Sequence, residues 1–370
     1  MKILFLCGSL ENQKDGVGDY TRKLAGAMIK QGKVCQIVAL MDKVTLVDTH
    51  EIQKIDGVEI EVLRLPYENG FHQNLQSSKN LIDSLNPDWI SLQYVPFSFH
   101  HKGMPLGFHN ALLPLVRDRN FHIMFHELWV GISVISPLKH KILGFFQHRI
   151  AKQIINKTKP LSITTTNILY DLILNKANIK TTVLPLFSNI SKVEADNNYF
   201  NSLLIQYNIT DASSCYFVGV FGTIYPQANI EDELMNLYES KEKNKKLIFL
   251  HFGRIGVYGK KELERLKDQF IGMIQFIELG ELPSDKVSTI LQKLNLGISC
   301  TPSQHVGKSG VFAAMKLHDV DVVMSGGESL PDYDVELQNK MPAYLNRKPE
   351  MWDVNYIAQQ FSSTLNSSKN

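Results

Sequence analysis

The sharpest chemical signal in the chain is the run Gly307-Lys308-Ser309-Gly310, which lies between an expected strand and an expected helix. A lysine ammonium, a serine hydroxyl and the N–H groups of a helix N-terminus all suit a phosphate or a diphosphate. The run imitates the end of a P-loop, but Pro302 stands where a Walker A motif needs its first glycine. The run therefore predicts generic phosphate binding, with a capped structural helix as the alternative.

A second candidate for an anion is Arg254, in the run Gly253-Arg254-Ile255-Gly256 at the end of an expected strand. The guanidinium fork matches the geometry of a phosphate, and the two glycines leave room for a ligand. The alternative interpretation is a surface arginine in an ordinary turn.

Two runs in the first half could contact a sugar. Gly16-Val17-Gly18-Asp19 allows a close backbone approach, and the helix that follows offers N–H groups to an anion or a hydroxyl. Its spacing is not GxGxxG, so no dinucleotide site is predicted. His126-Glu127-Leu128-Trp129 follows a strand, where His126 could bond a sugar hydroxyl or help in proton transfer. A plain helix entry and a polar loop entry are the alternatives.

Metal and nucleic-acid chemistry find little support. Val130 breaks the HExxH pattern, and Asp319-Val320-Asp321 stands at the amino end of a strand, where a solvated turn is expected. A net charge of +2 gives no electrostatic case for nucleic acid. The four cysteines form no CxxC pair, which predicts buried free thiols in a reducing, cytoplasmic compartment; they are Cys7, Cys35, Cys215 and Cys300.

The elements that must position these residues alternate between strand and helix, which is typical of α/β folds. The expected strands cover residues 3–6, 35–40, 58–65, 88–93, 121–125, 162–166, 182–184, 216–221, 247–252, 274–278, 296–299 and 320–324. The expected helices cover 20–31, 75–85, 108–119, 136–157, 197–206, 231–240, 260–270, 284–294, 309–318 and 351–365.

A chain of 370 residues is long for one hydrophobic core, so we expect two Rossmann-like domains that face a cleft. The predicted divisions are 1–190, 191–348 and a terminal helix segment 349–370. Ligands of such sheets lie at the carboxyl ends of the strands. That edge should carry the loops 8–19, 94–101, 126–131, 222–227, 253–256, 279–283 and 301–310.

The expected helix 136–157 is rich in basic residues and carries Phe145 and Phe146. Such a face could rest on anionic lipid, although a solvated helix face with two core aromatics is the alternative. The first apolar run, 3–7, is too short for a signal peptide, and no run approaches the ~18 apolar residues of a membrane span. We therefore expect a cytoplasmic protein with possible peripheral membrane contact at the inner face.

Several of these segments together resemble one family, the group 1 retaining glycosyltransferases of the GT-B fold. The run from Gly16 to Leu24, GVGDYTRKL, looks like their N-terminal loop and helix. Leu279-Gly280-Glu281-Leu282-Pro283 looks like their G-x-x-P turn before a helix. Residues 301–324 look like the loop, helix and strand of the donor site, and residues 351–365 look like the terminal helix that crosses back to the first domain.

The resemblance implies an enzyme that moves a sugar from a nucleotide diphosphate donor to a hydroxyl of a glycan, polysaccharide or lipid-linked acceptor. It implies retention of configuration and neither metal nor cofactor. The implied catalytic residues are His126, Lys308 and Arg254. The implied donor-binding residues are Gly16, Gly18, Gly222, Thr223, Gly253, Leu279, Leu282, His305, Gly307, Ser309 and Gly310, and the implied acceptor-binding residues of the first domain are Asp19, Tyr94, Glu127 and Trp129.

Two alternatives use the same fold. A sugar-nucleotide epimerase needs paired carboxylates, for which Glu127 and Glu281 are the candidates. A non-catalytic sugar- or nucleotide-binding protein fits the departures from the family, which usually carries two glutamates eight residues apart where His305 and Ala313 stand here. The family's arginine and lysine after the first strand of the second domain are also missing from loop 222–227, and Lys308 could replace them.

Overall fold

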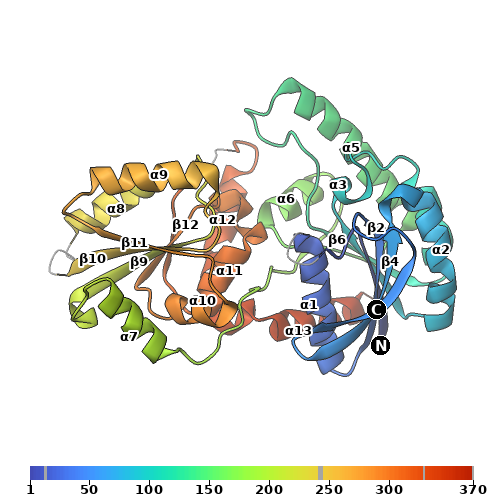
Figure 1. The fold of residues 1–370 in the computed structure, drawn as a ribbon. Coiled ribbons are helices and arrows are strands. Elements are labelled where there is room, and N and C mark those ends of the chain that lie inside the picture. The colour runs from blue at the N-terminus through green and yellow to red at the C-terminus, as the bar shows by residue number, and fades with distance from the viewer. Residues whose placement is uncertain (12–14, 241–244, 328–329, 369–370) are drawn as a thin grey trace. The chain divides into compact units, whose positions relative to one another are not determined.

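The computed structural model describes residues 1–11, 15–240, 245–327 and 330–368, and it divides into two compact units (Figure 1). Unit 1 comprises Met1–Pro185 with Val354–Asn370, and unit 2 comprises Leu186–Asp353. The chain therefore passes from one unit to the other after Pro185 and after Asp353, compared with the predicted divisions after residues 190 and 348. Residues 12–14 of the predicted loop 8–19 lie outside the described part.

The sheet of unit 1 has eight strands in the order β3-β4-β2-β1-β5-β6-β7-β8. All neighbours run parallel except β3 and β4. The central strands are continuous apolar runs because helices cover both faces of a parallel sheet. The strands are β1 Lys2–Cys7, β2 Val34–Asp42, β3 Thr49–Ile55, β4 Val58–Pro66, β5 Trp89–Tyr94, β6 Asn120–Phe125, β7 Ser162–Thr165 and β8 Thr182–Val183.

The sequence prediction missed β3, the edge strand. It is joined to β4 by a two-residue turn in which Asp56 has φ 48° and Gly57 has φ 81°. Two consecutive positive φ values are the geometry of a type I′ hairpin, and Asp-Gly is one of its preferred sequences. The Asp56-Gly57 pair is thus the signal that could have predicted this hairpin.

The helices of unit 1 are α1 Gly16–Lys30, α2 Gly70–Leu85, α3 Pro96–Phe99, α4 Phe108–Val116, α5 Leu138–Thr158, α6 Ile168–Lys176 and α13 Val354–Ser367. Helix α1 begins at Gly16 instead of the predicted residue 20. The predicted return of the terminal helix to the first domain is confirmed by the contacts of α13. Phe361 packs on Phe5 and on His122, with ring centroids 6.0 and 5.0 Å apart, and Gln31 Nε2 donates to Asn355 O over 2.8 Å.

Unit 2 is built on a five-stranded parallel sheet in the order β11-β10-β9-β12-β13. Its strands are β9 Cys215–Phe221, β10 Lys246–Phe252, β11 Gln275–Gly280, β12 Leu296–Ser299 and β13 Val322–Met324. Its helices are α7 Asn197–Gln206, α8 Ile230–Glu239, α9 Gly256–Gln269, α10 Ser284–Leu291, α11 Gly310–Leu317 and α12 Asp334–Leu345. This order, 3-2-1-4-5 from the first strand of the unit, is that of a doubly wound fold, as predicted.

Alternate residues of the unit 2 strands enter two separate cores. Phe217, Ile248 and Leu250 pack with α7, α10 and α11 on one face of the sheet. Val218 and Phe249 pack with α8 and α9 on the other face. Because side chains alternate between the two faces and helices cover both of them, only the strand ends remain for ligands. None of the helices in the described ranges is long and apolar enough to span a membrane.

Candidate functional site

The strand order of unit 2 reverses between β9 and β12, whose connections leave in opposite directions. Doubly wound folds bind ligands in the crevice outside the strand ends at this point. Gly222 directly follows β9 with φ 82°, a conformation that disfavours a side chain. A Cβ at Gly222 would lie 3.3 Å from Cγ2 of Val311, so the loop after β9 closely approaches the first turn of α11.

The N-terminus of α11 lies beside this switch point. Ser309 is its N-cap, and Ser309 Oγ accepts hydrogen bonds from Phe312 N over 3.2 Å and from Thr301 Oγ1 over 3.0 Å. The preceding 3₁₀ helix, η4 Ser303–Lys308, holds half-buried His305, buried Gly307 and exposed Lys308. The predicted phosphate-binding run therefore ends in a capped helix, with Lys308 at its entrance.

One residue near α11 was not predicted. The linker into unit 2 brings Asn189 to the helix, where its Nδ2 atom would lie 3.7 Å from a Cβ on Gly310. Asn189 is exposed and stands in a segment without regular structure. Since it precedes α11 by more than a hundred residues, sequence spacing carries no signal for this proximity.

The loops after β9 and β10 are joined to each other and to the end of β11. Thr223 Oγ1 donates to the carbonyl of Arg254 over 3.3 Å, and Gly253, at φ 89°, donates its N–H to Gly280 O over 2.6 Å. The guanidinium of Arg254 pairs with Glu281, Nη2 to Oε2 3.3 Å, and both side chains are exposed. Arg254 is therefore already paired on the β11 side of the edge, by a pair that solvent weakens.

Leu279 and Leu282 belong largely to the core. Both are partly buried and pack against the cluster that includes Ile277 and Val287. Because β11 is the edge strand, these leucines lie two strands away from the switch point. Their side chains are occupied by packing, so only their backbone groups remain for a ligand.

In unit 1, His126 directly follows β6 and is 8% exposed. The backbone N–H of His126 donates to Tyr94 O over 3.1 Å, and its ring Nε2 lies 2.8 Å from Gln93 Oε1. The ring of Tyr20 meets the imidazole edge-on, with centroids 4.8 Å apart. Gln93, which orients His126, was not predicted. The signal that could have found it is a polar residue near the carboxyl end of the otherwise apolar strand β5, which pairs with β6.

Tyr94 does not fit its predicted role in acceptor binding. It is 1% exposed, stacks on Phe99 with centroids 5.9 Å apart and meets Phe125 edge-on. Burial raises the pKa of its hydroxyl, which has no hydrogen-bond partner among the described residues. Tyr94 is thus a core residue, because its strand end is covered by α3.

The start of α1 also differs from the expectation. Asp15 caps the helix, accepting from Val17 N over 3.0 Å and from Gly18 N over 2.8 Å, so these N–H groups are not open to a ligand. Burial raises the pKa of Asp15. A Cβ on Gly18 would lie 2.4 Å from Ser9 O, whereas one on Gly16 would meet nothing described within 4 Å. Gly18 is required by packing, whereas a Cβ at Gly16 would meet no described atom within 4 Å.

The predicted acceptor residues Asp19, Glu127 and Trp129 lie at partly exposed positions. Asp19 forms an ion pair with buried Arg22. Trp129 stacks on His148 of α5, with centroids 4.3 Å apart, and Glu127 is half-buried beside His126. Asp19 is therefore tied into unit 1 by an arginine, whereas the Trp129 ring is tied to α5.

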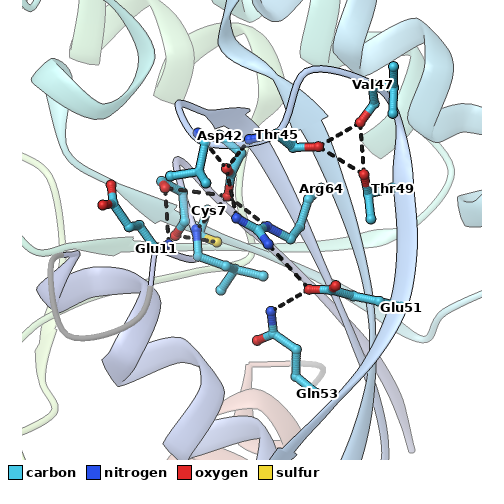
Figure 2. A network of polar contacts seen from close by, with 12 residues as sticks. Cys7, Glu11, Asp42, Thr45, Val47, Thr49, Glu51, Gln53 and Arg64 are labelled. Atoms are coloured by element: carbon cyan, nitrogen blue, oxygen red, sulfur yellow. Dashed lines mark hydrogen bonds and ion pairs between the residues drawn. The ribbon is translucent and has the colours of Figure 1, made fainter.

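A buried ion pair supports the loop after β1. The pair joins Asp42 to Arg64 and belongs to a network of polar contacts, which Figure 2 shows. Asp42 is fully buried and accepts from Arg64 Nε and Nη2, both over 3.0 Å, and from Leu10 N over 3.1 Å. Burial alone would raise the pKa of Asp42, but the hydrogen bonds from Arg64 and the backbone outweigh it and lower the pKa. Arg64 also contacts Glu51, Nη1 to Oε1 3.4 Å, which extends the network to β3.

Within the described ranges, no three His, Cys, Asp or Glu side chains gather as a metal site would require. The groups around α11 that could bind a ligand are backbone N–H groups, hydroxyls and the Lys308 ammonium.

The fold defines a class: a chain of two α/β units, one of them built on a doubly wound parallel sheet. No family model matches the sequence, and no curated protein matches it. Solved structures do share the fold across nearly the whole chain.

Sucrose-phosphate synthase from Thermosynechococcus elongatus has a TM-score of 0.57 at 11% identity, covering 100% of this chain and 97% of that one. Anabaena Alr3699/HepE in complex with UDP has a TM-score of 0.58 at 16% identity, covering 99% and 100%. The catalytic domain of starch synthase IV from Arabidopsis thaliana, bound to ADP and acarbose, has a TM-score of 0.54 at 12% identity, covering 99% of each chain. The predicted GT-B fold is confirmed by this likeness.

Proposed function

We propose that this protein is a glycosyltransferase that moves a sugar from a nucleoside diphosphate to an acceptor hydroxyl. The observation that carries the proposal is the switch point of unit 2, where Gly222, Ser309 and Lys308 surround the N-terminus of α11. A helix N-terminus and a lysine suit a diphosphate leaving group, and they stabilise its charge without a metal. The UDP and ADP bound to HepE and starch synthase IV support a nucleoside diphosphate as ligand.

In the proposed reaction the bond between the sugar and the diphosphate breaks, and the acceptor oxygen forms the new bond to the same carbon. The proton of the acceptor hydroxyl passes to an oxygen of the diphosphate, which leaves with the electron pair of the broken bond. Unit 2 holds the donor and unit 1 the acceptor, with retention of configuration. Lys308, Ser309 and Gly310 bind the diphosphate, Arg254 adds a second cation after leaving Glu281, and His126 contacts the transferred sugar.

A non-catalytic binding protein is the second candidate, and one observation favours it. Ala313, which stands where the resembled family has a ribose-binding glutamate, is fully buried in α11. It cannot supply a polar contact, so a ribose would need another partner such as Asn189. For an epimerase, no contact among the described residues supports Glu127 and Glu281 as a paired acid and base.

The test is thermal stability against a panel of nucleoside diphosphates, for the wild type, Lys308→Ala and the control Lys316→Ala in the last turn of α11. A ligand at ~100 times its Kd stabilises the folded state by about 2.7 kcal/mol. We expect one diphosphate to stabilise the wild type and the control but not Lys308→Ala. Release of that diphosphate from its sugar nucleotide then separates an enzyme from a binding protein. If no nucleoside diphosphate of the panel stabilises the wild type, the proposed donor site is wrong.

We further propose that α5 and the segment before it contact anionic lipid, which fits a lipid-linked acceptor at the cytoplasmic face of a membrane. The α5 surface consists of exposed apolar side chains interleaved with cations. Ile135 is 83% exposed and Phe145 54%. The set comprises Val134, Ile135, Leu138, Ile142, Phe145 and Phe146 with Lys139, Lys141, Arg149 and Lys152.

Charge supports a negatively charged partner for this surface. No Asp or Glu occurs between Glu127 and Asp171, a stretch that holds six Lys and Arg residues. Apolar side chains enter the interface while the cations meet lipid phosphates, at about 1 kcal/mol for each cation near the surface. The four cysteines are free and buried, which supports a reducing, cytoplasmic location.

Vesicle co-sedimentation tests the lipid contact. We expect the protein to bind vesicles containing phosphatidylserine more strongly than purely zwitterionic ones, with binding that weakens as salt rises. The double variant Phe145→Ser and Phe146→Ser should lose most of the binding. The control Ile205→Ser alters a more exposed apolar residue outside α5 and should bind like the wild type. Equal loss in both variants would contradict the assignment to α5.

A further inference from the structure

A chain of polar side chains crosses the interior of unit 1 and ends at His126. Ser91 and Gln93 come from β5, His122 from β6 and Thr164 from β7, and all four are at most 1% exposed. Strand register brings them together, since Ser91 of β5 pairs with His122 of β6, and β6 pairs on its other side with β7. Buried polar groups are costly unless each finds a partner, and here every link is a hydrogen bond of normal length.

The links run in one order. Thr164 Oγ1 lies 2.9 Å from His122 Nε2, and His122 Nδ1 lies 2.8 Å from Ser91 Oγ. Gln93 Nε2 lies 2.8 Å from Ser91 Oγ, and Gln93 Oε1 lies 2.8 Å from His126 Nε2. Each member other than the ends thus bonds two neighbours, so the direction of one hydrogen bond determines the direction of the next.

The far end of the chain sets that direction. The hydroxyl of Thr164 donates to Met124 Sδ, which leaves Thr164 Oγ1 as the acceptor of the hydrogen bond from His122 Nε2. Burial lowers the pKa of His122 to about 3, so the ring is neutral and its Nδ1 accepts.

The remaining links follow. Ser91 gives its hydroxyl proton to His122 Nδ1 and accepts from the amide nitrogen of Gln93. The amide oxygen of Gln93 is thereby turned towards His126, where it can only accept.

We infer that this relay holds His126 in the tautomer with the proton on Nε2, so that Nδ1 is the hydrogen-bond acceptor of the ring. Nε2 points into the sheet at Gln93, so the lone pair of the ring lies on Nδ1. Such a ring accepts from a hydroxyl and does not donate to a phosphate or carboxylate. Gln93, Ser91, His122 and Thr164 are positioning residues in this scheme, and the link to a sugar hydroxyl rests on the proposed function.

The test is nuclear magnetic resonance of ring-labelled histidine in the ligand-free protein, where a nitrogen that carries a proton differs in shift from one with a lone pair. We expect His126 to show the Nε2–H form near neutral pH. Thr164→Val keeps the shape of the side chain but removes the acceptor for His122, which allows every link to reverse. The ratio of Nε2–H to Nδ1–H at His126 should then fall at least about fivefold, the equivalent of one net hydrogen bond.

Thr165→Val is the matched control, because Thr165 is equally buried on β7 but takes no part in the relay. It should leave the His126 tautomer unchanged. An Nδ1–H or doubly protonated ring in the wild type, or equal spectra for the two valine variants, would overturn the inference. The nucleoside diphosphate panel is independent of this measurement. A protein that binds no nucleotide but shows the Nε2–H form refutes the proposed function and leaves the relay intact.

Discussion

Two glycines in the first turn of α1 should respond in opposite ways to the same substitution. A Cβ on Gly18 would lie 2.4 Å from Ser9 O and 3.3 Å from Leu10 Cα, so the backbone of the loop after β1 must move. A Cβ on Gly16 has nothing described within 4 Å. Overpacking of this kind costs about 1–3 kcal/mol, whereas an alanine in open space at a helix start changes the free energy of unfolding by less than about 0.5 kcal/mol.

Thermal unfolding measures the difference. For a unit of this size, each kcal/mol shifts Tm by roughly 2–4 °C, so Gly18→Ala should lower Tm by roughly 2–12 °C and Gly16→Ala by less than about 2 °C. Helical content by circular dichroism should remain the same in both variants, since α1 keeps its cap at Asp15. A Gly18→Ala protein as stable as the wild type would refute the packing argument, and so would a Gly16→Ala protein that is the less stable of the two.

The same pair separates packing from ligand binding. If the space at Gly16 admits the donor, Gly16→Ala should retain the Tm of the ligand-free protein but lose the stabilisation by a nucleoside diphosphate. If Gly16→Ala retains both, the space beside α1 has no part in nucleotide binding, and the proposed donor contact of Gly16 is wrong.

Three further predictions concern ion pairs and caps. Asp42→Asn leaves Arg64 without its buried partner and should cost about 3–5 kcal/mol in denaturant unfolding, against less than about 1 kcal/mol for Asp83→Asn in a pair with an exposed carboxylate. Because the folded-state pKa of Asp42 is lowered, its contribution is present above the unfolded value of about 3.9 and disappears as the pH falls through the folded value, which unfolding at pH 2–6 will show. Ser309→Ala removes the cap of α11 and should cost about 0.5–2 kcal/mol in the same assay. Arg254→Ala should change stability by less than about 1 kcal/mol, because its ion pair is exposed, yet weaken nucleoside diphosphate binding in calorimetry.

The alternation of apolar runs and helical periods was enough to predict the sheet of unit 2, because a buried parallel strand leaves an uninterrupted apolar run. The same reasoning missed β3, whose exposed alternating residues resemble a loop in composition, and its hairpin signal is confined to Asp56-Gly57. Both α1 and α9 begin at a glycine, Gly16 and Gly256, four residues before the predicted starts. Glycine disfavours a helix interior, which is why the starts were predicted too late. In the first turn of α1, packing requires the glycine, because a Cβ on Gly18 would lie too close to Ser9 O.

The structural positions of candidate site residues were predictable where they depend on neighbouring sequence alone. The run at Ser309 lies at the helix start and beside the switch point, as its sequence position between strand and helix indicates. Contacts between distant segments were not predictable, since nothing in the sequence near Gly310 points to Asn189, and nothing near His126 points to Gln93. Tyr94 shows the converse: its position at a strand end predicts exposure, but α3 covers that end.

The return of α13 to unit 1 has a consequence for synthesis on the ribosome. Phe5 in the first strand and His122 in the sixth both pack on Phe361, which is translated only after the whole of unit 2. At about 5–20 residues per second, this face of the unit 1 sheet stays uncovered for on the order of ten seconds or more while unit 2 is made. Unit 1 therefore lacks part of its core until the whole of unit 2 has been translated, although its first strand is made before any other.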